Sequence, residues 1–510
     1  MEYSRTKNVF LNALGGIAAR AFSIISAFLT RTIFIKILGI QYAGVSSVFT
    51  DILVVLSFAE LGIGSAITYA LYKPIADNDE KQICKYMNTY KLIYRVIAIV
   101  VVVAGIIIAP FLEYIIKNAP DIKENLRLIF LFYIINTASS YLMVYKGAFL
   151  TAAQKDYIVS KSKIIIAVLR TIIECVALIV FRNFIVYLTI GIGINIFQNY
   201  YIAKVAEKEY PVIKRSSKEK LTKDETKRLF NDVRALALYK VSSTVLNGTD
   251  SVITSSIFGA TTVGILGNYT LISNQLYNFM MQIFTATSAS IGNYAVYNEK
   301  EAQYNVFKKM NFICFWLYIM CSTCLWTLFN RFMQIWQGES RVFSSVIVAA
   351  IVGEFYIKGM LSPVSQFRTA NGLFIQGKYR PVIMAVLNIV ISIVLANNIG
   401  VVGIILGTII SRALTQLWYD PMLIYKSIFK RNVLKYYAEY CLNIGMLILS
   451  CGISQGLTYL ICPKNSIISL VVGAITAVII SNTIVLLIYS KSEEFKESII
   501  LIKRVVKRKL

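Results

Sequence analysis

The residues best suited to chemistry in this sequence are ionisable side chains inside long apolar stretches. A charge near the centre of a bilayer costs about 2.5–3.5 kcal/mol, so it usually faces a partner or a water-filled cavity. Five basic residues lie deep in such stretches: Arg20, Arg31, Lys240, Lys358 and Arg412. Guanidinium and ammonium groups bind phosphates well. The pattern therefore predicts a cationic cavity for an anionic ligand, with phosphate or pyrophosphate as the natural group.

Acidic residues are fewer than basic ones in the same stretches, and five of them lie well away from the ends: Asp51, Glu60, Glu174, Asp250 and Glu354. Glu60, Asp250 and Glu354 are candidate sites for a coupling ion. Arg170 and Glu174 stand four residues apart, the spacing of a structural ion pair along one helix. Other embedded cations lie near the ends of apolar stretches, where long side chains reach the interface: Lys36, Arg95, Lys146 and Arg234.

Uncharged polar residues in the apolar stretches allow two interpretations. Their amides and phenols can bind a sugar, or they can join neighbouring helices through hydrogen bonds. Both interpretations stay open for these residues: Asn136, Tyr141, Gln198, Asn199, Asn268, Tyr269, Asn274, Gln275 and Tyr277.

Several kinds of enzyme chemistry lack the residues they need. Histidine is absent, which excludes His-based acid–base catalysis and His metal sites. Cys321 and Cys324 form a C-x-x-C, but it lies in an apolar run without a second pair, so we interpret it as helix packing. No G-x-x-x-x-G-K-[ST] loop is present for nucleotide binding. We expect no metal, no catalytic residues and a protein that is not an enzyme.

The elements that position these residues follow from composition. Of 510 residues, 57% are hydrophobic and 15% are charged, far from the roughly 25% charged residues of soluble proteins. This indicates an all-α polytopic membrane protein. With a window of about 20 residues per span, fourteen spans are predicted: 10–38, 44–71, 89–112, 126–149, 163–181, 184–205, 231–257, 264–294, 309–330, 343–367, 381–397, 400–424, 436–461 and 466–490.

The basic residues also orient the chain. With a cytoplasmic N-terminus, 35 of the 52 basic residues fall in cytoplasmic segments and seven in external loops. This bias follows the positive-inside rule and predicts that both termini are cytoplasmic. It accounts for most of the net charge of +25, so no nucleic-acid partner is expected. The basic C-terminal tail is expected to lie on anionic headgroups of membrane lipids.

The sequence resembles itself at an offset of about 218–225 residues. Gly39 and Gly44 match Gly259 and Gly264, and the same offset of 220 relates Arg20 to Lys240. Two copies of a six-helix unit would enter the membrane in one orientation, which makes a parallel repeat. Four parts are therefore predicted: an N-terminal six-helix lobe (1–205), a cytoplasmic linker (206–230), a C-terminal six-helix lobe (231–425), and two extra helices with a basic cytoplasmic tail (426–510).

Four segments carry a family resemblance: 4–8 (SRTKN), 38–45 (LGIQYAGV), 59–66 (AELGIGSA) and 72–76 (YKPIA). They resemble oligosaccharide repeat-unit flippases of the Wzx type, in the multidrug/oligosaccharidyl-lipid/polysaccharide exporter superfamily. The resemblance implies two MATE-like six-helix lobes around a central cavity. It also implies a substrate, an undecaprenyl-pyrophosphate-linked oligosaccharide that moves from the inner to the outer leaflet for capsule or O-antigen assembly. A polysaccharide polymerase and a chain-length regulator are then expected partners, in the bacterial cytoplasmic membrane.

The expected mechanism is alternating access around the cationic cavity. The five deep cations would hold the pyrophosphate, and the polyprenyl tail would stay in lipid. A loaded site is nearly neutral and an empty one is cationic, so the membrane potential, about 2.3 kcal/mol per charge per 100 mV, would draw the empty site back towards the cytoplasm. Coupling to Na⁺ or H⁺ through the three acids is the alternative. No other cofactor is expected.

Three other functions are possible for a membrane protein of this kind. A multidrug exporter has the same architecture but favours cationic drugs, which the basic excess disfavours. A lipid II flippase differs only in the opening motif. A polymerase or glycosyltransferase would need a larger external loop than 113–125 or 331–342 provides.

The repeat yields a first test. Arg20→Ala and Lys240→Ala should each abolish transport, because each removes a cation at the same depth of one lobe. Transport that survives both substitutions would contradict this account of the site.

Overall fold

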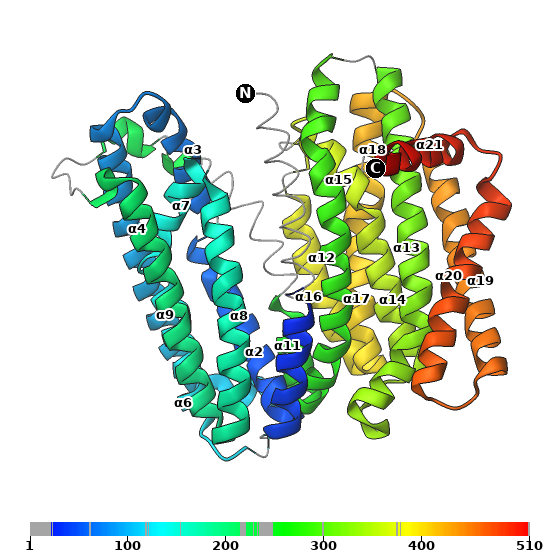
Figure 1. The fold of residues 1–510 in the computed structure, drawn as a ribbon, viewed down its shortest axis with the longest axis horizontal. Coiled ribbons are helices and arrows are strands. Elements are labelled where there is room, and N and C mark those ends of the chain that lie inside the picture. Colours follow the sequence, from blue (N-terminus) through cyan, green and yellow to red (C-terminus); the bar gives the residue numbers. More distant parts are fainter. Residues whose placement is uncertain are drawn as a thin grey trace. The chain divides into compact units, whose positions relative to one another are not determined.

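Every regular element that the structure describes is a helix (Figure 1). The structure is a computed structural model, and it describes residues 22, 24–60, 63–117, 120, 122–153, 155–214, 221–227, 229–231, 233, 248–297, 300–373, 376, 377 and 379–507. The chain divides into two compact units, Met1–Gly264 and Ile265–Leu510.

Unit 1 is a bundle of long helices joined by short turns. Residues 24–37 are helical, and the elements that follow are α2 (Ile40–Leu56), η1 (Ser57–Glu60), α3 (Ile63–Ala76), α4 (Glu80–Ile108), η2 (Ala109–Phe111), α5 (Leu112–Ile115), α6 (Leu126–Tyr141), α7 (Val144–Ala152), α8 (Asp156–Phe181), α9 (Phe184–Glu209), η3 (Pro211–Lys214) and α11 (Asp250–Phe258). Helix α12 (Ala260–Tyr297) begins in unit 1 and continues into unit 2.

Unit 2 is a second bundle, and one of its long helices contains two π-helical segments. Its further elements are α13 (Lys300–Gln337), η4 (Glu339–Arg341), α14 (Ser345–Met360), α15 (Ser362–Ala370), α16 (Arg380–Ile399), α17 (Val401–Arg412), the π-segment η5 (Ala413–Leu417), α18 (Trp418–Ile424), the π-segment η6 (Tyr425–Phe429), α19 (Leu434–Ile461), α20 (Ile467–Tyr489) and α21 (Glu493–Lys507).

Ten of the fourteen predicted spans coincide with described helices that could cross a membrane. Nine described helices are long and apolar enough to cross a membrane, and the pair α6 and α7, bent by 41°, makes a tenth. The predicted span 264–294 lies within α12, and the span 44–71 is divided into α2 and α3 by the 3-10 turn η1. Residues 10–21 and 23 of the span 10–38, and residues 232 and 234–247 of the span 231–257, lie outside the described residues.

Helices α2 and the start of α12 cross at two glycines. A Cβ on Gly44 would overlap the carbonyl oxygen of Ala260, and a Cβ on Gly264 would lie 2.5 Å from the carbonyl oxygen of Ile40. The offset of 220 exchanges these two contacts, because it relates residue 44 to 264 and residue 40 to 260. The glycine before each helix also has positive φ, +102° at Gly39 and +84° at Gly259. The crossing therefore has a local pseudo-twofold symmetry.

The two C-terminal spans, α19 and α20, pack on α13 through small and hydroxyl-bearing residues. Ser450 and Ser454 of α19 pair with Thr323 and Thr327 of α13 at 2.9 and 3.1 Å. On α20 large apolar residues are exposed, and the buried face carries Ser469, Gly473, Ala477 and Ser481. Small residues at the interface and large ones outside are the arrangement expected of helices packed in lipid.

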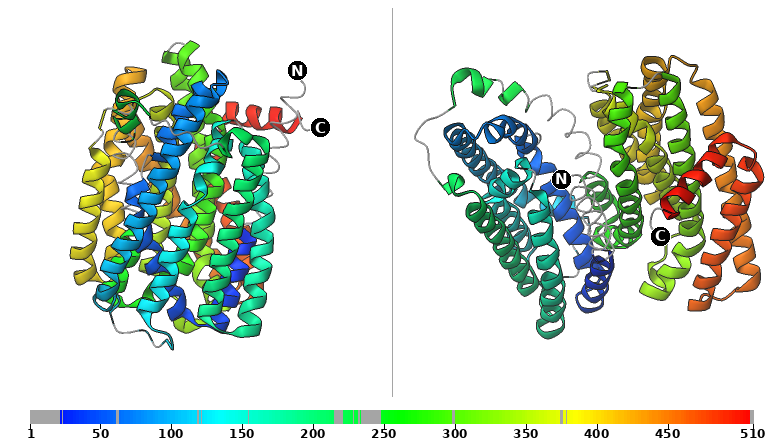
Figure 2. Two further views of the ribbon diagram at one scale, coloured as in Figure 1. Left: turned by 90° about the vertical axis from the view of Figure 1, so that its left-hand side faces the viewer. Right: turned by 45° about the horizontal axis from the view of Figure 1, so that its top comes forward.

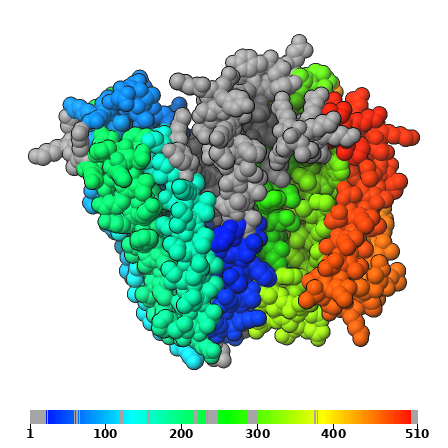
Figure 3. Space-filling view, in the orientation of Figure 1, coloured from blue at the N-terminus to red at the C-terminus, as the bar shows by residue number. Residues whose placement is uncertain are grey.

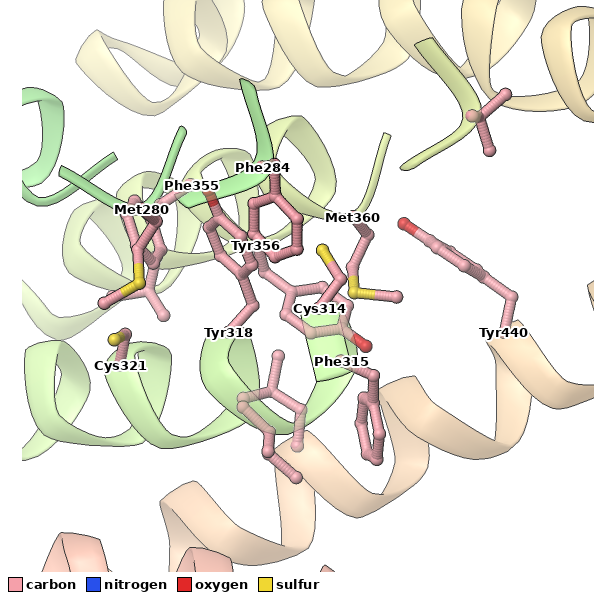
Figure 4. Packing of buried hydrophobic residues seen from close by; sticks show 14 of the residues in the cluster. Met280, Phe284, Cys314, Phe315, Tyr318, Cys321, Phe355, Tyr356, Met360 and Tyr440 are labelled. Carbon is pink, nitrogen blue, oxygen red and sulfur yellow. The ribbon is translucent and has the colours of Figure 1, made fainter. Parts of the chain in front are cut away.

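The core of unit 2 is rich in aromatic and sulfur-containing side chains (Figure 4). Tyr318 of α13 packs against Phe355 of α14 with ring centroids 5.2 Å apart. Gly359 makes this possible, because a Cβ there would overlap the Tyr318 ring. Cys314, Tyr356 and the rest of the cluster hold α14 against α13, and this fixes the charged face of α14 described below.

The glycine crossing gives a testable prediction. Gly44→Ala and Gly264→Ala should each lower stability by about 1–3 kcal/mol, since each new methyl group overlaps backbone that cannot move away cheaply. Thermal unfolding of the purified protein in detergent measures the effect. Gly193→Ala in α9 is the control, because nothing lies within 4 Å of its Cβ position. Equal stability of all three variants would contradict a close crossing.

Candidate functional site

Three of the predicted site residues form one cluster in unit 2. Glu354 and Lys358 lie one turn apart on α14, and Arg412 is the last residue of α17. Arg412 Nη2 lies 3.7 Å from Glu354 Oε1, and the two side chains are 13% and 27% exposed. We call Glu354, Lys358 and Arg412, with Asn274 and Tyr277 of α12, the unit 2 cluster.

Lys358 occupies a polar and aromatic corner of this cluster. Its Nζ lies 3.4 Å from Asn274 Oδ1 and 4.4 Å from the centroid of the Tyr277 ring. A cation over a phenol ring is stabilised by the ring quadrupole without losing its charge. Asn274 and Tyr277 belong to the polar residues whose role the sequence left open, and here both contact a residue that was predicted to bind the substrate.

The local backbone explains why Arg412 is placed here. α17 ends at Arg412 and continues directly into the π-segment Ala413–Leu417. π-Segments occur often at functional sites, because they redirect side chains that a regular α-helix would place elsewhere. Helix α14, which carries Glu354 and Lys358, ends at Met360, and Pro363 lies in the first turn of the next helix, α15.

The electrostatics of the unit 2 cluster favour an anion. The cluster contains two cations and one carboxylate, and the Nε–H of Arg412 is buried with no hydrogen-bond partner in the described part of the chain. A buried guanidinium with an unused donor can form a charge-assisted bond to a phosphate oxygen. Glu354 holds the guanidinium in place, and the cluster as a whole keeps a net positive charge.

In unit 1, Arg31 lies beside an aromatic and polar cavity. Its Nη2 donates to the carbonyl oxygen of Gly264 at 3.3 Å, and Tyr133 and Tyr187 are close enough to interact with its charge. Both tyrosines line a cavity of about 230 Å³, whose other lining residues include Asn136, Arg170 and Glu174.

The lining of this cavity includes an ion pair and Asn136, the first member of an asparagine ladder, a row of three hydrogen-bonded asparagines. Arg170 Nε donates to Glu174 Oε1 at 2.6 Å, which confirms the ion pair that the spacing of four residues indicated. Asn195 donates to Asn136 Oδ1 at 2.9 Å, and Asn199 donates to Asn195 Oδ1 at 3.2 Å. These amides join α9 to α6, so the described structure uses them to connect helices.

The other residues predicted to bind substrate or a coupling ion belong to unit 1 or lie outside the described residues. Glu60, in η1 of unit 1, accepts a hydrogen bond from Tyr94 at 3.1 Å. Asp250 begins α11, also within unit 1. Arg20 and Lys240 lie outside the described residues.

The cations predicted to reach the interface have two kinds of environment. Lys36 and Arg95 are exposed, as expected for side chains that extend towards headgroups. Lys146 instead pairs with the buried Glu207. Arg234 lies outside the described residues.

A second charged cluster in unit 2 could not be predicted from the sequence. Asp420 of α18 is 1% exposed and accepts from Arg368 at 3.0 Å and from Arg380 at 2.8 Å. Arg368 also donates to the carbonyl oxygens of Leu373 and Gln376, so it ties the turn between α15 and α16 to α18. The sequence suggested loop cations here, since neither arginine lies in a long apolar run.

Comparison with known proteins rests on structure. No family model matches the sequence, and no curated protein matches it. Among solved structures, the lipid II flippase MurJ in an inward closed conformation matches with a TM-score of 0.69 and 15% identity, over 94% of this chain and 99% of MurJ.

Multidrug transporters give lower scores. An inward-facing MATE family transporter of the MOP superfamily has a TM-score of 0.59 at 10% identity, over 79% of this chain and 95% of its own. The MATE multidrug transporter DinF-BH has a TM-score of 0.54 at 15% identity, over 83% of this chain and 96% of its own. This chain is a multi-pass membrane protein with the fold that MurJ and the MATE transporters of the MOP superfamily share.

Proposed function

We propose that this protein is a Wzx-type flippase that moves undecaprenyl-pyrophosphate-linked oligosaccharide repeat units from the inner to the outer leaflet of the bacterial cytoplasmic membrane. The products would feed assembly of a capsule, an O-antigen or a related surface polysaccharide. The observation that carries the proposal is the unit 2 cluster, where the cations Lys358 and Arg412 outnumber the single carboxylate of Glu354.

The chemistry of the unit 2 cluster supports an anionic substrate with a polar attachment. Arg412 offers its buried Nε–H, and Lys358 offers an ammonium group. A pyrophosphate accepts stronger hydrogen bonds from such donors than a neutral molecule does, because both partners are charged. Asn274 and Tyr277 add an amide and a phenol beside the ammonium group, and such groups also suit a sugar.

The main alternative is a multidrug exporter, since MATE transporters share the fold. A lipophilic cation would meet Arg412 and Lys358 as like charges, so the unit 2 cluster disfavours this alternative. A lipid II flippase fits the unit 2 cluster equally well, and MurJ is a solved structure of that kind. The opening segments 4–8 and 38–45 are what favour an oligosaccharide carrier.

The proposed cycle is alternating access with the pyrophosphate held by Arg20, Arg31, Lys240, Lys358 and Arg412. The membrane potential returns the empty, cationic site towards the cytoplasm. Coupling to Na⁺ or H⁺ would instead use Glu60, Asp250 or Glu354. A polymerase and a chain-length regulator would use the glycan after it reaches the outer leaflet.

Depletion of the protein tests the function. Complete repeat units on undecaprenyl pyrophosphate should accumulate on the cytoplasmic leaflet, because the glycan cannot cross the bilayer unaided. Mass spectrometry of lipid-linked sugars, with a leaflet-specific labelling step, measures both identity and side. Accumulation on the outer leaflet would instead indicate a block in polymerisation, and unchanged lipids with altered drug tolerance would favour the exporter.

Substitutions in the unit 2 cluster test the site. Lys358→Gln and Arg412→Gln should each reduce transport about tenfold or more, since a hydrogen bond to a charged group contributes about 1.5–3 kcal/mol. Arg412→Lys should retain more activity than Arg412→Gln, because it keeps the charge. The assay is the pool of cytoplasmic lipid-linked repeat units at matched protein levels.

Arg431→Gln is the matched control for Arg412→Gln. Arg431 lies in the same unit but is exposed and pairs with Glu301. Its loss should leave transport unchanged. Equal effects of Arg412→Gln and Arg431→Gln would mean that the unit 2 cluster does not hold the substrate.

A further inference from the structure

A separate cavity lies in unit 2, between α13 of the predicted C-terminal lobe and the helices that follow that lobe. It has a volume of about 330 Å³ and lies where the starts of α13 and α19 meet the end of α20 and the start of α21. Small-molecule pockets span about 300–1,000 Å³, so this one is large enough for a lipid headgroup. None of the described residues that were predicted to bind substrate lines it.

The inner wall offers hydrogen-bond acceptors that lack donors. Glu439 of α19 lines the cavity, and no described residue forms an ion pair with it. Asn311 Oδ1 and the Tyr436 hydroxyl are buried and without a hydrogen-bond partner in the described part of the chain. Tyr436 itself is only 2% exposed. Buried polar atoms are normally paired, so these atoms point to a ligand that carries N–H donors.

One lysine at the cavity is available for a phosphate. Lys308 is already bound to Glu494. Burial disfavours the charge of Glu494, but the hydrogen bonds and the charge of Lys308 together outweigh it and lower the pKa of that carboxyl. Lys435 lines the cavity one turn before Glu439 and is exposed; its charge acts on Glu439, but it forms no direct ion pair with any described residue. The cavity thus holds a cation and an anion, and neither is engaged in a direct ion pair within the described chain.

The rim of the cavity faces lipid. Leu442 and Ile488 line it and are 50% and 47% exposed. From them, exposed leucines, isoleucines and valines continue along α19 and α20, whose surface is coloured orange to red in Figure 3. An apolar surface adjoining a charged cavity fits an amphipathic ligand.

Helix α21 places the cavity at the depth of headgroups. It lies across the ends of the spans of unit 2, as two views show (Figures 1 and 2). Phe495 packs on Phe312 and Trp316 at centroid distances of 6.1 and 5.6 Å, and Glu497 pairs with Lys309 at 2.7 Å. A helix with one apolar and one charged face, lying across the bundle, is typical of the membrane interface.

We infer that this cavity binds a membrane phospholipid with a phosphoethanolamine headgroup. The primary ammonium group donates to Glu439 and Asn311, the phosphate lies against Lys435, and the acyl chains follow α19 and α20. A choline headgroup has no N–H to donate. An anionic headgroup lacks the positive charge that Glu439 requires.

Lipid selectivity of the full-length protein in detergent tests this inference. Phosphatidylethanolamine, phosphatidylcholine and phosphatidylglycerol with identical chains are compared by native mass spectrometry. Phosphatidylethanolamine should bind about tenfold more tightly than phosphatidylcholine, as expected for charged hydrogen bonds. Glu439→Gln should remove this preference. Glu497→Gln, which changes an exposed carboxylate on α21, should retain it.

A second variant keeps the test decisive if Glu439→Gln folds poorly. Lys435→Gln alters an exposed side chain, and it should weaken phosphatidylethanolamine and phosphatidylcholine equally, because both carry the phosphate. Equal binding of these two lipids to the unaltered protein would overturn the inference. So would a preference for phosphatidylglycerol, or displacement of phosphatidylethanolamine by polyprenyl phosphate, which would make the cavity part of the substrate path.

Discussion

Hydrocarbon offers no hydrogen bonds, so every polar group inside the bundles must find its partner within the chain or in a ligand. This constraint organises both units. The asparagine ladder of Asn136, Asn195 and Asn199 satisfies amides in unit 1. Hydroxyl pairs join α13 to α19 in unit 2. Polar atoms that remain without partners in the described chain then become informative, and they include atoms at Arg412 and at the cavity beside α21.

The fold class could be predicted from the sequence because the same constraint requires each span to be a helix of about 20 mostly apolar residues. All-α architecture and the positions of the spans follow from apolar runs alone, and the described helices agree with them. Local breaks are different, since they depend on tertiary contacts. The division of the second span at Ser57–Glu60 and the π-segments after Arg412 leave no periodic signal in the sequence.

The candidate site could be predicted only in part. Depth in an apolar run identified Glu354, Lys358 and Arg412, because a charge in lipid is costly enough to be conspicuous. Contacts between charges on different helices depend on how those helices pack, and the sequence does not show this packing. The ion pair between Arg412 and Glu354 could therefore be seen only in the structure. Asp420 lies near the end of the predicted span 400–424, but Arg368 and Arg380 come from other segments, so nothing in the sequence shows that these three charges meet.

The two π-segments have a consequence for how this protein tolerates insertions and deletions. A π-segment holds one residue more than the α-helix it interrupts, and one residue corresponds to about 100° of rotation around a helix axis. The extra residue of Ala413–Leu417 is contained within one wider turn, so the helix after it keeps the rotation that a regular α-helix one residue shorter would give. Deleting a single residue there would return the segment to regular α geometry and leave Asp420 directed at Arg368 and Arg380. A deletion in α18 itself has no extra residue to remove, so it would turn Asp420 by about 100° and separate it from both arginines.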